Sequence, residues 1–265
     1  MNIFFRKIIY KIPFLHKTCK KLVEYQSYIF YKKLKQDGKC INIDILKTMP
    51  TSKKCFIVGN GPSLNVEDLN AIKGYDCFAA NLIFKVFPET DWRPRYYFIQ
   101  DRYARVSDFL NRTDIKYLFI GDYFWKHRSF SNSNALCYHH AVCVKDEEMK
   151  FSINPEEVIY DASTVTYAML QVAFCMGYNE IFLLGIDHNY PTVFDENGKV
   201  KTTKAGKSHF FDDDNPEEVI ANVIMMERGY RKAKEVAAEK GIKIYNVTRG
   251  GMLEVFDRKN LDDIL

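Results

Sequence analysis

The sequence feature that most constrains the fold is an apolar strand that runs directly into a glycine turn, Cys55-Phe-Ile-Val-Gly59-Asn60-Gly61-Pro62-Ser63-Leu64. A helical stretch follows within a few residues. Glycines let a backbone approach a ligand closely and expose its N–H groups, and a phosphate binds well at the start of a helix. The string therefore predicts a ligand-binding turn, and the alternative is a plain tight turn. It matches neither a Walker loop nor the GxGxxG pattern.

Short apolar runs continue from Ser52 onward, each followed by a loop and a helical stretch. Strands that alternate with helices predict an α/β fold with a doubly wound, mostly parallel, Rossmann-like sheet. Such sheets bind ligands beyond the carboxyl ends of their strands. We expect strands at Cys55–Val58, Cys77–Ala80, Tyr96–Ile99, Tyr117–Ile120, Ile181–Leu184 and Ile242–Tyr245. We expect helices at Val66–Ile72, Ser163–Met176 and Pro216–Lys240, and a short helical turn at Tyr103–Leu110.

The positive charge of the chain is concentrated in an N-terminal arm. Residues 1–39 hold ten Lys or Arg and two acidic residues, whereas the remainder holds 28 basic and 32 acidic residues. The net charge of +4 is therefore a property of the arm, and we expect no nucleic-acid partner. We divide the chain into a basic helical arm with a linker, residues 1–50, and an α/β domain, residues 51–265.

Residues 1–36 show the pattern of an amphipathic helix, which Pro13 should kink or split. A basic face beside an aromatic face suits a helix that lies on an anionic leaflet, so the pattern predicts peripheral contact with the inner face of the cytoplasmic membrane. The alternative is a helix packed on the body or on a second copy in a homo-oligomer. Residues 35–50 are expected to form a polar linker.

The seven cysteines are scattered and include no CxxC pair, which suits a reducing cytosol better than an oxidising compartment. No run of 18 apolar residues is present, so we expect no membrane span. The first residues make a poor signal peptide, because Arg6, Lys7 and Lys11 interrupt the apolar stretch. These patterns predict a cytoplasmic protein.

Polar residues follow two of the expected strands. Asp187 and His188 follow one strand, and Gln100 and Asp101 follow another. Because parallel strands end at one edge of a sheet, we expect these side chains to face the same crevice.

A second cluster of polar residues precedes the long apolar helix. Ser163 or Thr164 would cap this helix, and hydroxyls beside free N–H groups offer a second contact for phosphate or ribose. The alternative is ordinary capping.

An irregular run from Pro191 to Ser208 is long enough to be a lid. It leads to His209, which could act as a general base near neutral pH, although a lone loop histidine is more often only solvated.

Three further patterns are rejected, and we expect no resident metal. Ala205-Gly-Lys-Ser208 lacks the upstream glycine and strand of a P-loop. Cys137, His139, His140 and Cys143 do not have the spacing of a structural zinc site. The acidic run Asp212–Asp214 is more simply a solvated helix N-terminus.

With GNGPSL, GYNEIFLLGID and the later His209 in this order, residues 52–250 resemble the bacterial metal-independent sialyltransferases. They resemble more nearly the related 6-hydroxymethylpterin pyrophosphokinase (MptE)-like domain family, which occurs in surface polysaccharide and flagellin glycosylation clusters. Three positions depart from the sialyltransferase pattern. Ser-Thr-Val stands where the sialyltransferases have Thr-Ser-Gly, Tyr190 is one position late, and His188 has no counterpart.

The resemblance implies a role for several of these residues. His209 would be the base that deprotonates the acceptor and Tyr190 the support of the leaving phosphate, while Asn60, Asn81, Gln100 or Asp101, Ser163 and Thr164 would bind the donor. Position in the glycine turn or at a strand end, and not the resemblance, adds Asp187 to the catalytic residues and Gly59, Gly61, Pro62, Ser63 and His188 to the donor site.

The resemblance implies a glycosyltransferase of surface polysaccharide synthesis that moves a nonulosonic or sialic acid from a CMP-sugar to a glycan or lipid-linked acceptor. It would require no cofactor. The first alternative is a 6-hydroxymethylpterin pyrophosphokinase that uses ATP and Mg²⁺, with Asp101, Asp187 or Asp212–Asp214 as carboxylate ligands. The second is a non-catalytic scaffold that binds a nucleotide.

Overall fold

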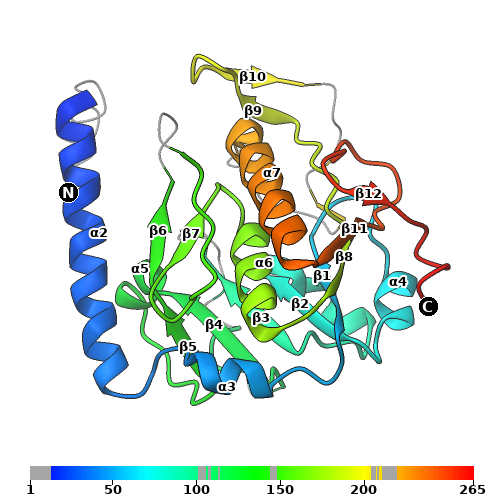
Figure 1. Cartoon of the computed structure of the whole chain (residues 1–265), viewed down its shortest axis with the longest axis horizontal. Coiled ribbons are helices and arrows are strands. Elements are labelled where there is room, and N and C mark those ends of the chain that lie inside the picture. The colour runs from blue at the N-terminus through cyan, green and yellow to red at the C-terminus, as the bar shows by residue number, and fades with distance from the viewer. Residues whose placement is uncertain are drawn as a thin grey trace.

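The computed structural model describes residues 13–100, 106, 109–112, 114–143, 148–203, 207, 209–210 and 220–265, with side chains from residue 21 onward. Its centre is an eight-stranded sheet in the order β12-β11-β8-β1-β2-β3-β4-β5, in which every neighbouring pair is parallel (Figure 1). The strands are β1 (Lys54–Val58), β2 (Asp76–Ala80), β3 (Tyr96–Ile99), β4 (Tyr117–Gly121), β5 (Ala135–Tyr138), β8 (Glu180–Leu184), β11 (Lys243–Asn246) and β12 (Asp257–Arg258).

Both faces of the sheet are apolar. Successive side chains point to opposite sides of a strand, so a strand of consecutive apolar residues supplies apolar side chains to both faces. In β1, Cys55 and Ile57 lie in one core and Phe56 and Val58 lie in the other. The first core is covered by α3 (Ile43–Thr48), α6 (Val165–Met176) and α7 (Val223–Lys240), which lie in front of the sheet in Figure 1. The second is covered by α4 (Val66–Ala71), the 3₁₀ helix η1 (Asn81–Glu89) and α5 (Asp122–Lys126). The predicted doubly wound α/β fold is confirmed.

The strand order reverses direction at β1. The chain moves outward from β1 through β2, β3, β4 and β5, and then returns to place β8 on the other side of β1. The connections after β1 and β8 therefore lead to helices on opposite faces of the sheet, α4 and α7, and open α/β sheets bind ligands beyond the strand ends at such a reversal.

The six predicted strands and the helices α4, α6 and α7 are present, with ends that differ by at most seven residues and, for β3, not at all. The helix α6 begins only at Val165, because Ser163 has a φ of 61° and Thr164 caps the helix. Most of the helical turn predicted at Tyr103–Leu110 lies outside the described residues, as do residues 216–219. The elements η1, α5, β5 and β12 were not predicted. Five further elements were not predicted either: α3, the pair β6 (His140–Val142) and β7 (Ile159–Asp161), and the hairpin β9 (Thr192–Phe194) and β10 (Val200–Thr202).

The hairpin corrects the expectation of an irregular run from Pro191 to Ser208 for residues 191–203, and residues 204–206 and 208 lie outside the described residues. The strands β9 and β10 pair antiparallel, and a turn closed by the Asp195 side chain joins them. The Asp195 carboxylate accepts from the N–H groups of Asn197 and Lys199. The polar Asp-Glu-Asn-Gly sequence that suggested a loop is therefore the tip of a hairpin.

The described part of the N-terminal arm is the helix α2 (Pro13–Gln36), and the expected effect of Pro13 stays a prediction because residues 1–12 lie outside the described residues. The helix stands beside the edge strand β5 and the helix α5 (Figure 1). No helix in the described part of the chain has the length and hydropathy that a membrane crossing requires.

The prediction of a polar linker over residues 35–50 is wrong for its second half. The side chains of Ile41, Leu46 and Met49 are almost fully buried in the core on the α6 face. The helix α3 packs against α6. The backbone of Cys40 forms an isolated β-bridge with the backbone of Cys137 in β5. The segment looks polar in sequence because only one side of a short helix is apolar.

We predict that Leu46→Ala lowers the free energy of unfolding by about 2–5 kcal/mol, because the side chain is fully buried. Its neighbour Ile45 is 56% exposed, so Ile45→Ala is the matched control and should change stability by less than about 0.5 kcal/mol. Urea denaturation of both variants measures the difference. Equal stabilities would mean that α3 is not part of the core.

Candidate functional site

The loop after β1 is locked to the loop after β8 by backbone hydrogen bonds. The N–H of Gly59 donates to the carbonyl of Leu184 at 2.8 Å, and the N–H of Gly61 donates to the carbonyl of Gly185 at 2.9 Å. A Cβ atom on Gly59 would lie 2.4 Å from the Gly185 oxygen, and one on Gly61 would lie 1.9 Å from Oδ2 of Asp187. Neither position has room for a side chain.

Asp187 completes this lock from the β8 side. Its carboxylate accepts from the N–H of Ser63 at 3.2 Å and from the Ser63 hydroxyl at 2.8 Å. Burial raises the pKa of Asp187 above its ordinary value, and the two hydrogen bonds from Ser63 oppose that shift. Asp187 thus holds the glycine turn in place, and a catalytic role for it stays a prediction.

The lock corrects one sequence-based expectation. The two glycines were expected to expose N–H groups to a ligand, but both N–H groups donate to β8 carbonyls. The glycines are needed because the two loops approach each other closely. Any anion at this edge must therefore be bound by other donors.

Three of the seven buried side-chain atoms that lack a hydrogen-bond partner among the described residues follow β1, β2 and β8 at this edge of the sheet. Oδ1 of Asn60, Oδ1 of Asn81 and Nδ1 of His188 are buried and have no hydrogen-bond partner among the described residues. The Asn60 amide N–H₂ donates to the carbonyl of Ala80 at 3.4 Å, so the turn after β1 lies against the end of β2. Buried polar atoms are nearly always paired in folded proteins, so these three indicate a place for a polar ligand or ordered water.

Backbone strain marks the same edge. Asn81, Ser163 and His188 are the non-glycine residues with positive φ in the described chain, at 54°, 61° and 54°. Each lies within four residues of the end of β2, β7 or β8. Left-handed backbone is costly for such residues and is concentrated at functional sites.

His188 connects this edge to the start of α6. Its ring makes T-shaped contacts with Tyr190 and Tyr230, at centroid distances of 6.3 and 5.8 Å. The side chains of Thr164 and Thr166 at that helix start oppose the rise in the pKa of Tyr230 that burial causes. Burial lowers the pKa of His188 and raises that of Tyr190, so both side chains are uncharged near neutral pH.

His209 is brought next to the glycine turn through the backbone of its neighbour. The N–H of Phe210 donates to the carbonyl of Asn60 at 3.0 Å, and the Phe210 ring packs against the second core. The side chain of His209 is half-buried. Two other predicted groups, Asp101 and Asp212–Asp214, lie outside the described residues.

The family to which the chain belongs follows from its sequence as a whole. The model of the family 6-hydroxymethylpterin diphosphokinase MptE-like matches residues 29–193, which run from the middle of α2 into the hairpin and include the whole lock between β1 and β8. The chain is an MptE-like protein. The match begins before residue 52, where the sequence resemblance was expected to start.

Solved structures show which known proteins share this fold. The MAf glycosyltransferase from Magnetospirillum magneticum AMB-1 matches 80% of this chain at 15% identity, with a TM-score of 0.50. The chain spans about a third of that protein, since the match covers 34% of it. The sialyltransferase CstII from Campylobacter jejuni, solved with cytidine-5′-monophosphate, matches 77% of this chain and 84% of its own at 17% identity, with a TM-score of 0.45. At these identities the likeness is one of fold. No curated protein matches this chain.

The MptE-like protein also contains a polar network that the sequence reasoning missed. Gln100 lies at the end of β3, where it accepts from the Tyr138 hydroxyl and donates to Asp161, each at 3.2 Å. Oδ2 of Asp161 lies 3.3 Å from Nε2 of His140. Burial alone would lower the pKa of His140, but its contact with Asp161 raises that pKa above the ordinary value.

The two adjacent histidines of this region have different partners. His140 faces Asp161, whereas His139 lies against Tyr28 and Tyr31 of α2 and donates from Nδ1 to the Asp122 carboxylate at 2.7 Å. Among the residues that the structure describes, no three His, Cys, Asp or Glu side chains come together as a metal site.

We predict that Gly61→Ala lowers the free energy of unfolding by about 1–3 kcal/mol, because the new methyl group would overlap the Asp187 carboxylate and separate it from Ser63. Gly74→Ala is the matched control, since a Cβ there meets nothing within 4 Å. Urea denaturation should find the control close to wild type. Equal effects of the two substitutions would contradict the lock.

Proposed function

We propose that this MptE-like protein is a glycosyltransferase that takes its sugar from a CMP-activated donor, in particular a nonulosonic acid, in the synthesis of a surface polysaccharide. The observation that carries the proposal is the set of buried, partnerless polar atoms on Asn60, Asn81 and His188 beside the β1–β8 lock. A nucleotide offers the base and ribose donors that two amide oxygens and one imidazole nitrogen need. The fold shared with a bacterial glycosyltransferase supports the same assignment.

The donor phosphate is proposed to lie at the start of α6. Gly61 cannot receive it, because its N–H donates to Gly185. Ser163 and Thr164 precede α6, a 12-residue helix whose N-terminus favours an anion. Tyr190, an uncharged phenol, would donate to the departing phosphate. Donors aimed at the charge that develops on the leaving group stabilise the transition state without a resident metal.

His209 is proposed to remove the proton from the acceptor hydroxyl as that oxygen attacks the anomeric carbon. The histidine is tethered to Asn60 through Phe210, so a donor bound beside Asn60 would lie within its reach. An imidazole suits this role because its ordinary pKa lies near neutral pH. The acceptor would be a glycan, free or lipid-linked.

We predict that CMP raises the melting temperature of the protein in the absence of Mg²⁺, by roughly 5–10 °C at a hundredfold excess over its Kd. A thermal-shift panel of CMP, UDP, GDP and ATP, each with and without Mg²⁺, makes the measurement. Asn60→Ala should abolish the CMP shift, whereas Asn197→Ala, an exposed residue in the hairpin turn, should keep it. No shift with CMP would rule out the proposed donor.

A second candidate function is supported by the family match over residues 29–193, whose description is that of a 6-hydroxymethylpterin diphosphokinase. That reaction needs ATP phosphates bridged by Mg²⁺. The described residues bring no metal-binding group together, and Asp187 already accepts two hydrogen bonds from Ser63. A thermal shift with ATP that requires Mg²⁺, and none with CMP, would favour this candidate.

We predict that His209→Ala slows the release of CMP from CMP-N-acetylneuraminic acid by roughly 100- to 10,000-fold while the thermal shift with CMP remains. The matched control is His127→Ala, which removes an exposed histidine at the end of α5. Unchanged release in His209→Ala would exclude this residue as the base. CMP binding with no release by the wild-type protein would instead identify a scaffold.

A further inference from the structure

One face of the arm helix α2 packs against the body of the protein. Ser27, Tyr31 and Leu34, which are spaced four and three residues apart, are 2–7% exposed. The Tyr31 hydroxyl donates to the carbonyl of Glu156 at 2.6 Å, and the Tyr31 ring lies against His139. This spacing defines a single side of a helix, so the orientation of α2 about its own axis is fixed.

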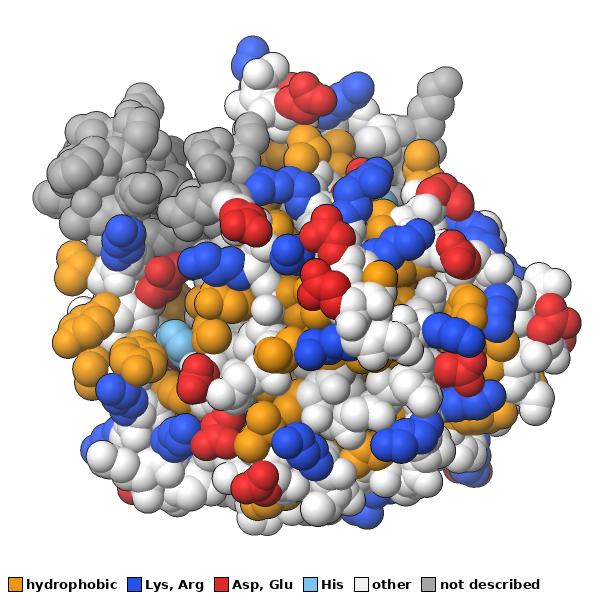
Figure 2. All heavy atoms as spheres, in the orientation of Figure 1, with side chains coloured by type: hydrophobic (Ala, Val, Ile, Leu, Met, Phe, Trp, Pro, Cys, Tyr) orange, Lys and Arg blue, Asp and Glu red, His pale blue; other side chains and the backbone are white. Residues whose placement is uncertain are grey.

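The opposite face of α2 carries an apolar stripe. Leu22, Tyr25 and Ile29 are spaced three and four residues apart and therefore line one side of the helix. They are 54%, 62% and 50% exposed, although they lie on a helix whose other side is well packed. Figure 2 shows hydrophobic side chains gathered with lysines at this edge of the molecule. We call Leu22, Tyr25 and Ile29 the outer stripe.

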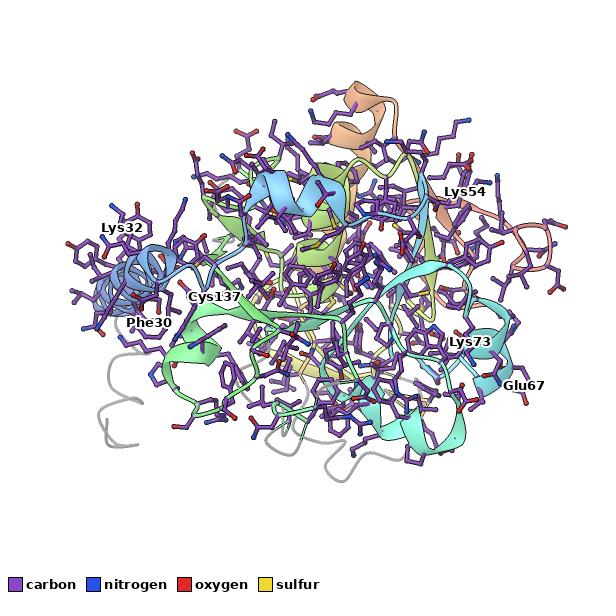
Figure 3. The ribbon with its side chains drawn as sticks, turned by 90° about the horizontal axis from the view of Figure 1, so that it is seen from below. Phe30, Lys32, Lys54, Glu67, Lys73 and Cys137 are labelled. Atoms are coloured by element: carbon purple, nitrogen blue, oxygen red, sulfur yellow. The ribbon has the colours of Figure 1, made fainter. Side chains whose placement is uncertain are left out.

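Lysines border the outer stripe on both sides. Lys32 and Lys33 follow Ile29 by three and four residues, which places them on either flank in the next turn, and Lys21 precedes Tyr25 by four. All three are exposed. Figure 3, which views the molecule from below, shows α2 at the edge of the structure with Lys32 on it and Cys137 on the neighbouring strand.

The charge of the arm continues this pattern in the sequence. Residues 1–39 carry ten basic and two acidic side chains, a net charge of +8, whereas the rest of the chain is net acidic. Residues 1–12, which lie outside the described structure, add six Ile or Phe with Arg6, Lys7 and Lys11 and no acidic residue. A surface that is both apolar and strongly positive matches a partner that is apolar beneath a layer of negative charge.

We infer that the outer stripe of α2 docks on an anionic phospholipid bilayer, with Leu22, Tyr25 and Ile29 entering the interface and the flanking lysines facing lipid phosphates. Because Tyr31 and Leu34 fix the opposite face of α2 to the body, the membrane would lie beyond the β5 edge of the sheet. A second copy of this chain could also cover an apolar stripe. Two arms with ten basic side chains each would, however, repel each other at such a contact.

The test is sedimentation of the full chain with phosphatidylcholine vesicles, with and without phosphatidylglycerol. The wild-type protein is expected to sediment with the anionic vesicles and to stay in solution with the neutral ones. The combined variant Leu22→Ser, Tyr25→Ser, Ile29→Ser should bind at least about tenfold more weakly. The variant Lys32→Glu, Lys33→Glu should bind at least about thirtyfold more weakly, because each of the two lost lysines contributes about 1 kcal/mol near an anionic surface.

The matched control replaces three apolar side chains of similar exposure elsewhere, Ile45→Ser, Ile153→Ser and Val200→Ser, which are 56%, 53% and 56% exposed. This variant should bind vesicles as the wild type does. Circular dichroism and melting temperature verify that each variant is folded. The readout is binding to lipid, so it does not depend on the proposed transferase activity.

Two results would overturn the inference. One is binding of the wild type to anionic vesicles that the stripe and lysine variants leave unchanged, or no binding at all. The other is a dimer in analytical ultracentrifugation that the stripe variant dissociates, which would show that a second copy covers the outer stripe.

Discussion

The site depends on one constraint, which is the close approach of the turn after β1 to the turn after β8. Two backbone hydrogen bonds and the Asp187–Ser63 contact hold the turns together, and the space between them admits no Cβ at Gly59 or Gly61. These turns lie where the strand order reverses, so the lock fixes the geometry of the edge at which α/β sheets bind ligands.

Everything proposed for the site follows from what the lock leaves unpaired. The glycine N–H groups donate within the lock, whereas Oδ1 of Asn60 has no hydrogen-bond partner among the described residues. Asn81 and His188, which follow the neighbouring strands β2 and β8, also carry such an atom, and both have a left-handed backbone. Such strain and such orphaned atoms lower the stability of a fold, and they are retained where they organise a ligand. The start of α6, linked to His188 through Tyr230, extends the same site.

The sheet was predictable because its central strands are buried on both faces and therefore appear as continuous apolar runs, as in Ile181–Leu184. The helix α3 was not, since only Leu46 among its six residues is buried. The contact between Ser63 and Asp187 joins residues that lie 124 positions apart, and no local sequence pattern predicts such a pair. The strand ends that carry the site were predicted, but the use of the glycine N–H groups was not, because that depends on which loop lies opposite.

The most direct test of the central claim is a crystal structure of the protein soaked with CMP. The account predicts a nucleotide beyond the ends of β1, β2 and β8, with hydrogen bonds to Oδ1 of Asn60 and Oδ1 of Asn81 and its phosphate at the start of α6. A nucleotide bound at another surface, with water alone on these two oxygens, would contradict it.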